Sequence, residues 1–111
     1  MKFVDVLGTR YFIRVDVPAE DMPEDADGCI DCTIHVIKIA EMIPDRNSVQ
    51  NMDAYRKKVL RHEIIHAFFY ESGIWNSSGY SECWGMDEQI TDWMAIQSPK
   101  IFRAFKEAGC L

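Results

Sequence analysis

Residues 60–70 read Leu-Arg-His-Glu-Ile-Ile-His-Ala-Phe-Phe-Tyr, and this stretch decides both the fold class and the chemistry. Its apolar residues recur three or four positions apart, which predicts a helix with one stripe facing a core. That stripe consists of Leu60, Ile64, Ala67 and Phe68. We expect the helix to begin between residues 47 and 51, where Asn and Ser offer N-caps, and to end near Ser72, because Gly73 follows. Its basic residues are expected on the solvated face: Lys57, Lys58 and Arg61.

Within this helix, His62-Glu63-Ile64-Ile65-His66 forms an H-E-x-x-H pattern. Residues four apart on a helix point to the same side, so the two imidazoles can share one metal ion. Neutral imidazoles suit Zn²⁺, and Glu63 lies beside the ion, where it can take a proton from a water that the metal activates. The alternative interpretation is a pair of surface histidines with a neighbouring charge.

A zinc hydrolase also needs a third protein ligand. No third histidine follows His66 at the spacing of an H-x-x-G-x-x-H extension, and His35 is expected on an upstream strand. A carboxylate is therefore expected, and the candidates are Glu71, Glu82, Asp87, Glu88 and Asp92. Glu88 and Asp92 lie four apart on the next predicted helix. One can bind the metal while the other accepts the spare N–H of a ligand histidine.

The segments before this helix are predicted to form strands. Residues 2–7 and 11–17 are rich in Val, Ile, Phe and Tyr, and a hairpin is expected across residues 7–9. Residues 16–27 hold six acidic side chains and two prolines, which indicates a solvated loop. Strand character returns in residues 28–42, so we expect a third strand there.

The segments after the helix are predicted to be helical as well. Residues 73–86 read as a loop, and a second helix is expected over residues 87–97. A third is expected over 98–109, because Pro99 suits the first position of a new helix. The sequence therefore predicts a single α+β domain over residues 1–111, with an antiparallel sheet of about three strands followed by three helices.

Composition excludes some functions. A net charge of −6 argues against a protein that binds nucleic acid through its phosphates. No apolar run approaches the ~20 residues needed to cross a bilayer, and no signal peptide is recognisable at the N-terminus. We therefore expect a cytoplasmic protein without a membrane or nucleic-acid partner.

The four cysteines are expected to stay reduced in the cytosol. Cys29 and Cys32 form a C-x-x-C pair, a spacing used by zinc knuckles and redox centres. No second pair accompanies them, and β-branched residues follow Cys32 where a redox motif would open a helix. We interpret both cysteines as small packed side chains.

The order of motifs resembles a known group of enzymes. His62-Glu63-x-x-His66, followed on a later helix by Glu88-x-x-x-Asp92, resembles the gluzincin metallopeptidases. The resemblance implies a minimal zincin-like domain that binds zinc through His62, His66 and Glu88. It also implies that Glu63 is the catalytic base and that Asp92 orients a ligand histidine.

A narrower resemblance concerns residues 88–95, Glu-Gln-Ile-Thr-Asp-Trp-Met-Ala. They are similar to the E-x-x-A-N-x-F-A segment of the ImmA/IrrE family, with Thr91 and Asp92 in place of its Ala-Asn. The whole chain is also similar to short phage and prophage proteins of the same layout. Many relatives carry a helix-turn-helix or sensor domain, which this sequence lacks.

The expected function is zinc-dependent hydrolysis of a specific protein or peptide substrate. In this fold class an edge strand beside the active helix holds the substrate backbone, and the strand within residues 29–39 suits that role. The oxyanion needs a further donor, for which Tyr80, Tyr70 and His35 are candidates. Tyr80 is preferred, because it lies in the loop between the helices that carry the ligands.

Two other functions are compatible with the same residues. A binding protein that keeps the zincin scaffold without turnover is favoured by the aromatic residues Trp75, Tyr80 and Trp84, which make good interface anchors. A purely structural zinc ion is disfavoured by Glu63, which has no role in a closed site.

Overall fold

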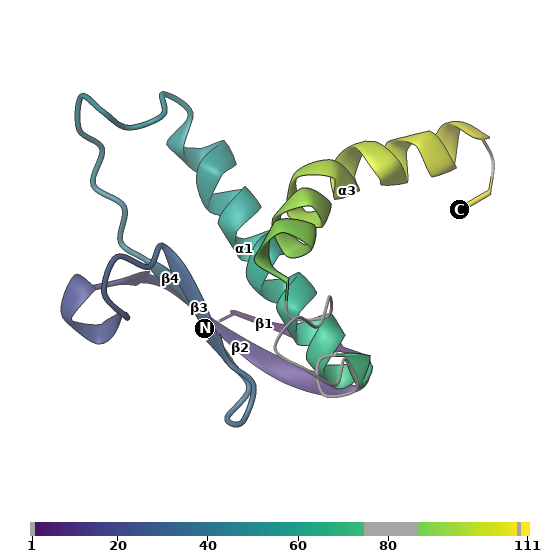
Figure 1. The fold of residues 1–111 in the computed structure, drawn as a ribbon, viewed down its shortest axis with the longest axis horizontal. Helices are drawn as coiled ribbons and strands as arrows, with labels where there is room; N and C mark the ends of the chain where they lie inside the picture. Colours follow the sequence, from purple (N-terminus) through teal and green to yellow (C-terminus); the bar gives the residue numbers. More distant parts are fainter. Residues whose placement is uncertain (1, 75–86, 109) are drawn as a thin grey trace.

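The computed structural model describes residues 2–74, 87–108 and 110–111. In chain order, the elements are β1 (Lys2–Val6), β2 (Thr9–Val17), the 3-10 helix η1 (Ala19–Asp21), β3 (Gly28–Asp31), β4 (Val36–Ala40), α1 (Met52–Glu71) and α3 (Glu88–Ala108). The strands form one sheet in the order β1-β2-β4-β3, and α1 crosses one face of it (Figure 1). The N-terminal half of α3 packs on α1.

The first hairpin is confirmed. β1 pairs antiparallel with β2 and Val6 lies opposite Thr9. The two residues between them have positive φ, 51° at Leu7 and 91° at Gly8, which is the conformation that a two-residue hairpin turn requires. The carboxylate of Asp5 accepts a hydrogen bond from the Gly8 N–H at 3.0 Å and closes the turn.

The prediction of an antiparallel sheet of about three strands is wrong. The described residues form a four-stranded mixed sheet, in which β2 and β4 are parallel neighbours and the other pairs are antiparallel. The segment 28–42 is not one strand but a hairpin of β3 and β4. The chain leaves β2, forms β3 at the far edge and returns as β4 beside β2, which makes that pair parallel.

The turn of the second hairpin explains the error. Asp31 Oδ1 accepts a hydrogen bond from the Thr33 N–H at 2.9 Å, and His35 has a positive φ of 58°. An aspartate that bonds the backbone two residues on forms a turn. The β-branched residues Thr33 and Ile34 therefore lie in an exposed turn, although their type favours a strand.

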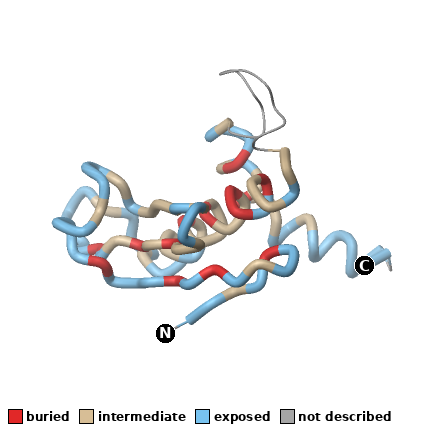
Figure 2. The backbone as a smooth tube through the Cα atoms, turned by 90° about the horizontal axis from the view of Figure 1, so that it is seen from below, coloured by how far each residue is buried: buried red, intermediate tan, exposed pale blue. Residues whose placement is uncertain are grey.

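The core lies between α1 and the sheet. Tyr11 of β2, Ile37 of β4 and Ala67 of α1 are fully buried there, and Val59 is nearly so. The buried residues follow the layer where α1 faces the strands (Figure 2). Because α1 packs closely against the sheet through these residues, the direction of its side chains is fixed.

The predicted bounds of α1 are confirmed within a few residues. Asn51 is the N-cap, and its side chain accepts a hydrogen bond from the Ala54 N–H at 3.0 Å. Gly73 has a φ of 87°, the conformation that ends a helix. Near this end, Glu71 accepts hydrogen bonds from Thr9 Oγ1 at 2.8 Å and Tyr11 Oη at 2.6 Å, which tie α1 to β2.

The prediction of three helices is also wrong for the described part of the chain. Residues 88–108 form one continuous helix through Pro99, where two helices were expected. Proline has no N–H to donate to the carbonyl four residues earlier, which is that of Ala95. Arg61 Nε donates to this carbonyl at 2.6 Å instead. The helix therefore bends at Pro99 without ending, and Arg61 is not simply a solvated residue (Figure 1).

Beyond Pro99, α3 leaves the body of the molecule (Figures 1 and 2). Phe102 and Phe105 are exposed there, with 57% and 43% of their surface accessible. On the half that packs against α1, Thr91 and Ala95 are fully buried. Only this first half contributes to the core and to the site.

Candidate metal centre

α1 presents the H-E-x-x-H residues beside the start of α3. His66 is 5% exposed and the side chain of His62 is 15% exposed. Their ring centroids lie 4.8 Å apart and the ring planes meet at 80°. One helical turn separates the two residues, so both imidazoles lie on the same side of α1, as a shared ligand would require.

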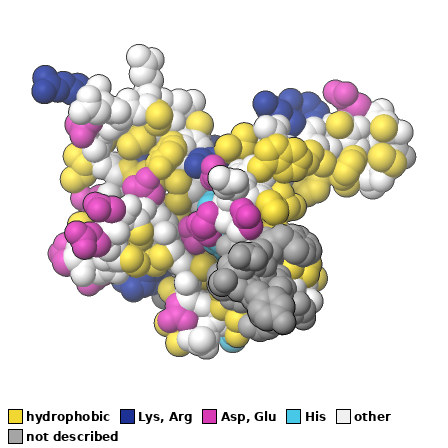
Figure 3. All heavy atoms as spheres, viewed as in Figure 1, with side chains coloured by type: hydrophobic (Ala, Val, Ile, Leu, Met, Phe, Trp, Pro, Cys, Tyr) yellow, Lys and Arg dark blue, Asp and Glu magenta, His cyan; other side chains and the backbone are white. Residues whose placement is uncertain are grey.

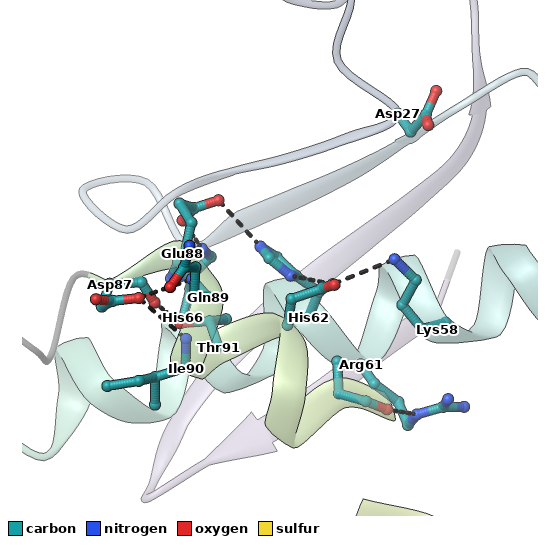
Figure 4. A network of polar contacts seen from close by, with 12 residues as sticks. Asp27, Lys58, Arg61, His62, His66, Asp87, Glu88, Gln89, Ile90 and Thr91 are labelled. Carbon is teal, nitrogen blue, oxygen red and sulfur yellow. Dashed lines mark hydrogen bonds and ion pairs between the residues drawn. The ribbon is translucent and has the colours of Figure 1, made fainter. Parts of the chain in front are cut away.

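Glu88, the first residue of α3, closes this arrangement. Its Oε1 lies 2.6 Å from His66 Nε2, and its Oε2 lies 3.3 Å from His62 Nε2 (Figure 4). The cap of α3 fixes this position, because Asp87 Oδ1 accepts hydrogen bonds from the backbone N–H groups of Gln89 and Ile90 at 2.7 and 3.0 Å. Asp87 is thereby used as a cap.

Asp92 lies one turn further along α3, against the other nitrogen of the same imidazole. Its Oδ1 is 3.2 Å from His62 Nδ1 and 3.2 Å from Lys58 Nζ. Partial burial raises the pKa of Asp92, but hydrogen bonds from Lys58 and His62 together outweigh burial and lower that pKa below its usual range. An ionised Asp92 fixes the tautomer in which His62 Nε2 is free to bind a metal.

Glu63 is 6% exposed and lies beneath the sheet edge. Its Oε2 would be 3.1 Å from a Cβ atom placed on Gly28, so the carboxylate touches the backbone of β3. Burial raises the pKa of Glu63 from 4.5 to about 7, with His62 partly opposing the shift and Glu88 adding to it. A carboxylate with a pKa near 7 is suited to exchange protons at neutral pH.

These residues border a cleft of about 180 Å³ between β3 and the two helices. Its lining includes Gly28 of β3, Lys58, His62 and Glu63 of α1, and Glu88 and Asp92 of α3. Lys58 is the residue that sequence reasoning missed, although it lies four residues before His62 and therefore on the same side of α1. The cleft gives a small ligand access to the imidazole of His62 and to the carboxylate of Glu88, whereas His66 does not line it.

The donor atoms fit a zinc ion. His62, His66 and Glu88 are the group of potential ligands found among the described residues, with one atom from each lying within 4.8 Å of the others. Tetrahedral bonds of ~2.0–2.1 Å place neighbouring donors about 3.3 Å apart. The separation of 3.3 Å between His62 Nε2 and Glu88 Oε2 is of this size, whereas His66 Nε2 contacts the other carboxylate oxygen, Oε1. The 2.6 Å contact between His66 and Glu88 would have to open by about 0.7 Å.

The other carboxylate candidates have different positions. Glu71 is engaged with Thr9 and Tyr11 of β2, and these hydrogen bonds, led by that of Tyr11, lower the pKa of Glu71. Glu82 lies outside the described residues. The geometry therefore favours Glu88 as the third ligand and Asp92 as the residue that orients His62.

Of the predicted oxyanion donors, His35 and Tyr70 do not line the cleft. Tyr80 lies outside the described residues, as do Trp75 and Trp84. The ring of His35 packs edge-on against Tyr11 with centroids 5.2 Å apart. Tyr70 lines a separate cavity beside β3 and not the cleft.

The C-x-x-C pair lies on β3 and its turn. Cys29 and Cys32 are free thiols, and burial raises the pKa of each. Within the described ranges, neither belongs to a group of three potential metal ligands. Raised pKa values disfavour the thiolate that a metal site or a redox centre needs.

In comparisons with protein-family models, curated proteins and solved structures, no family, protein or structure matched this chain. Within the residues described, no helix is both long and apolar enough to cross a membrane. The evidence that bears on function is therefore the arrangement of His62, His66 and Glu88.

Proposed function

We propose that this chain is a zinc-dependent peptidase that cleaves a specific protein or peptide substrate. The observation that carries the proposal is the convergence of one ligand atom each from His62, His66 and Glu88 within 4.8 Å, with Glu63 buried beside them. A bound zinc ion would supply an activated water and polarise the substrate carbonyl. The resemblance to gluzincin and ImmA/IrrE metallopeptidases supports the same reading.

In this proposal, each residue of the chain has a defined task. Glu63 takes the proton of the attacking water and delivers it to the leaving amine, for which a pKa of about 7 is suited. Asp92 holds His62 by its Nδ1, and Lys58 holds Asp92. The open edge of β3 beside Glu63 offers backbone groups to an extended substrate.

The second candidate is a binding protein without turnover. The observation in its favour is the apolar surface of α3, where Trp93 and Phe102 each have 57% of their surface exposed. Exposed aromatic side chains on a helix are common anchors of protein interfaces. We further propose the cytosol as the compartment, which the free thiols of the described cysteines support.

One experiment separates the two candidates. Zinc-loaded wild type and Glu63→Gln are incubated with a proteome-derived peptide pool, and new peptide termini are identified by mass spectrometry. Glu63→Gln keeps the ligands and the surface but removes the base. The peptidase proposal predicts termini that appear only with the wild type and disappear with a chelator. Identical, uncleaved pools would contradict it.

A further inference from the structure

Among the strands of the described residues, β3 forms an edge of the sheet and pairs with β4 alone. The Ala40 N–H donates to the Asp27 carbonyl at 2.9 Å. Hydrogen-bonded positions alternate along an antiparallel pair, so Gly28 and Ile30 direct their N–H and C=O groups to the open edge. A peptide can therefore add to β3 by backbone hydrogen bonds at these two residues.

The pairing register assigns the side chains of β3 to two faces. Ile30 lies opposite Ile37, which is fully buried under α1. Cys29 lies opposite Lys38 and therefore belongs to the outer face, turned away from α1. Asp31 follows on the same outer face. A peptide strand paired with β3 would alternate in the same way, so every second side chain would point to the outer face.

A cavity of about 710 Å³ opens beside Cys29 and Asp31 of this outer face, between the β3–β4 hairpin and the loop around η1, and its lining also includes Ile30 and Tyr70 on the α1 side. Its apolar wall includes Met22, Pro23 and Ile34. Its acidic residues are Glu20, Asp21 and Asp31, against the single basic residue Lys38, whose ammonium group donates to the Asp21 carbonyl at 3.2 Å.

We propose that a substrate peptide lies along β3 and places an arginine or lysine side chain in this outer cavity. The proposal rests on the proposed function, which puts the scissile bond near Glu63 and Gly28. Gly28 and Asp31 are three positions apart on β3, so the basic residue lies within about three positions of that bond.

A basic side chain suits both parts of the cavity. Its aliphatic stem can pack against the apolar wall while its charged tip reaches the carboxylates. Hydrogen bonds from Thr33 lower the pKa of Asp31 and keep it ionised. Acidic side chains also gather on the face of the molecule that carries this loop and the metal cleft (Figure 3). An acidic side chain in this cavity would be repelled by Glu20, Asp21 and Asp31.

The test measures binding and cleavage separately. A positional-scanning library of fluorescein-labelled nonapeptides carries Arg, Lys, norleucine or Glu at each fixed position. Binding to zinc-loaded Glu63→Gln is followed by anisotropy, and cleavage by the wild type is followed by mass spectrometry. Exposed ion pairs each change affinity by up to about five-fold, so we expect Arg or Lys to exceed norleucine by about five- to ten-fold at one or two positions.

Two matched variants localise the effect. Glu20→Gln/Asp21→Asn should reduce the preference to less than about two-fold. Glu24→Gln/Asp25→Asn removes the same charge from the same loop, outside this cavity, and should leave the preference unchanged.

Equal preferences in both variants, no preference for basic residues, or no binding of any peptide would overturn the inference. Cleavage without basic preference would leave the peptidase proposal standing. Basic-selective binding without any cleavage would contradict the peptidase proposal alone.

Discussion

Removing the guanidinium of Arg61 should destabilise α3 around Pro99. Arg61 Nε is 2.6 Å from the Ala95 carbonyl, and Ala95 is fully buried, so Arg61→Met leaves a buried acceptor without its charged donor. Hydrogen bonds to charged groups contribute about 1.5–3 kcal/mol. We expect a loss of that size in the free energy of unfolding by urea, with lower helix content and faster amide exchange after Pro99.

The control restores a donor from within the helix. In Pro99→Ala, residue 99 regains the N–H that pairs with the Ala95 carbonyl, so the additional change Arg61→Met should cost less than about 0.5 kcal/mol. Circular dichroism and urea denaturation of the four proteins complete the cycle. An equal loss from Arg61→Met in both backgrounds would refute the explanation of the continuous helix.

Three further predictions concern the cleft. In Gly28→Ala, the new Cβ would lie 2.7 Å from Val59 Cγ1, so we expect the free energy of unfolding by urea to fall by about 1–3 kcal/mol. Adding Val59→Ala should recover part of this loss. Full stability of the single variant would contradict this contact. Asp92→Ala should weaken zinc binding by about 10–100-fold and Glu88→Ala by more, as measured by competition with a chromogenic chelator; the reverse order would exchange their roles. Because the pKa of Glu63 is raised to about 7, the zinc-free folded protein keeps a proton that the unfolded chain releases near pH 4.5, and this contribution to stability is lost as the pH rises to 7. Glu63→Gln should therefore gain stability relative to wild type between pH 5 and pH 8, and parallel curves would contradict the assignment.

The local features were the most predictable from sequence. The bounds of α1 follow from the Asn51 cap and the Gly73 stop, which are short-range signals. The stripe predicted to face the core is only partly correct, because Ala67 is fully buried but Phe68 is 40% exposed. The H-E-x-x-H spacing likewise places both imidazoles on one side of any helix. Glu88 could be proposed because it lies four residues before Asp92 on the next predicted helix and matches the gluzincin pattern, although only the cap at Asp87 shows why it faces His66.

The predictions were wrong where a contact from another helix, or a turn closed by a side-chain hydrogen bond, outweighs the secondary-structure preference of the local residues. Thr33 and Ile34 favour a strand, but the hydrogen bonds of Asp31 turn the chain there and create β3 and β4. Pro99 favours a helix start, but Arg61 of another helix occupies the carbonyl that proline leaves open. Neither effect has a signal in hydrophobic periodicity.

The most direct test of the central claim is the zinc content of the purified protein after mild chelation and return of zinc. If His62, His66 and Glu88 bind the ion, we expect a ratio near one zinc per chain for the wild type and for Cys29→Ser/Cys32→Ser. We expect almost none for His66→Ala. His66 lies 2.6 Å from Glu88 and shares its carboxylate with His62, so its loss should abolish the site. Zinc that persists in His66→Ala and disappears in the double cysteine variant would contradict the account.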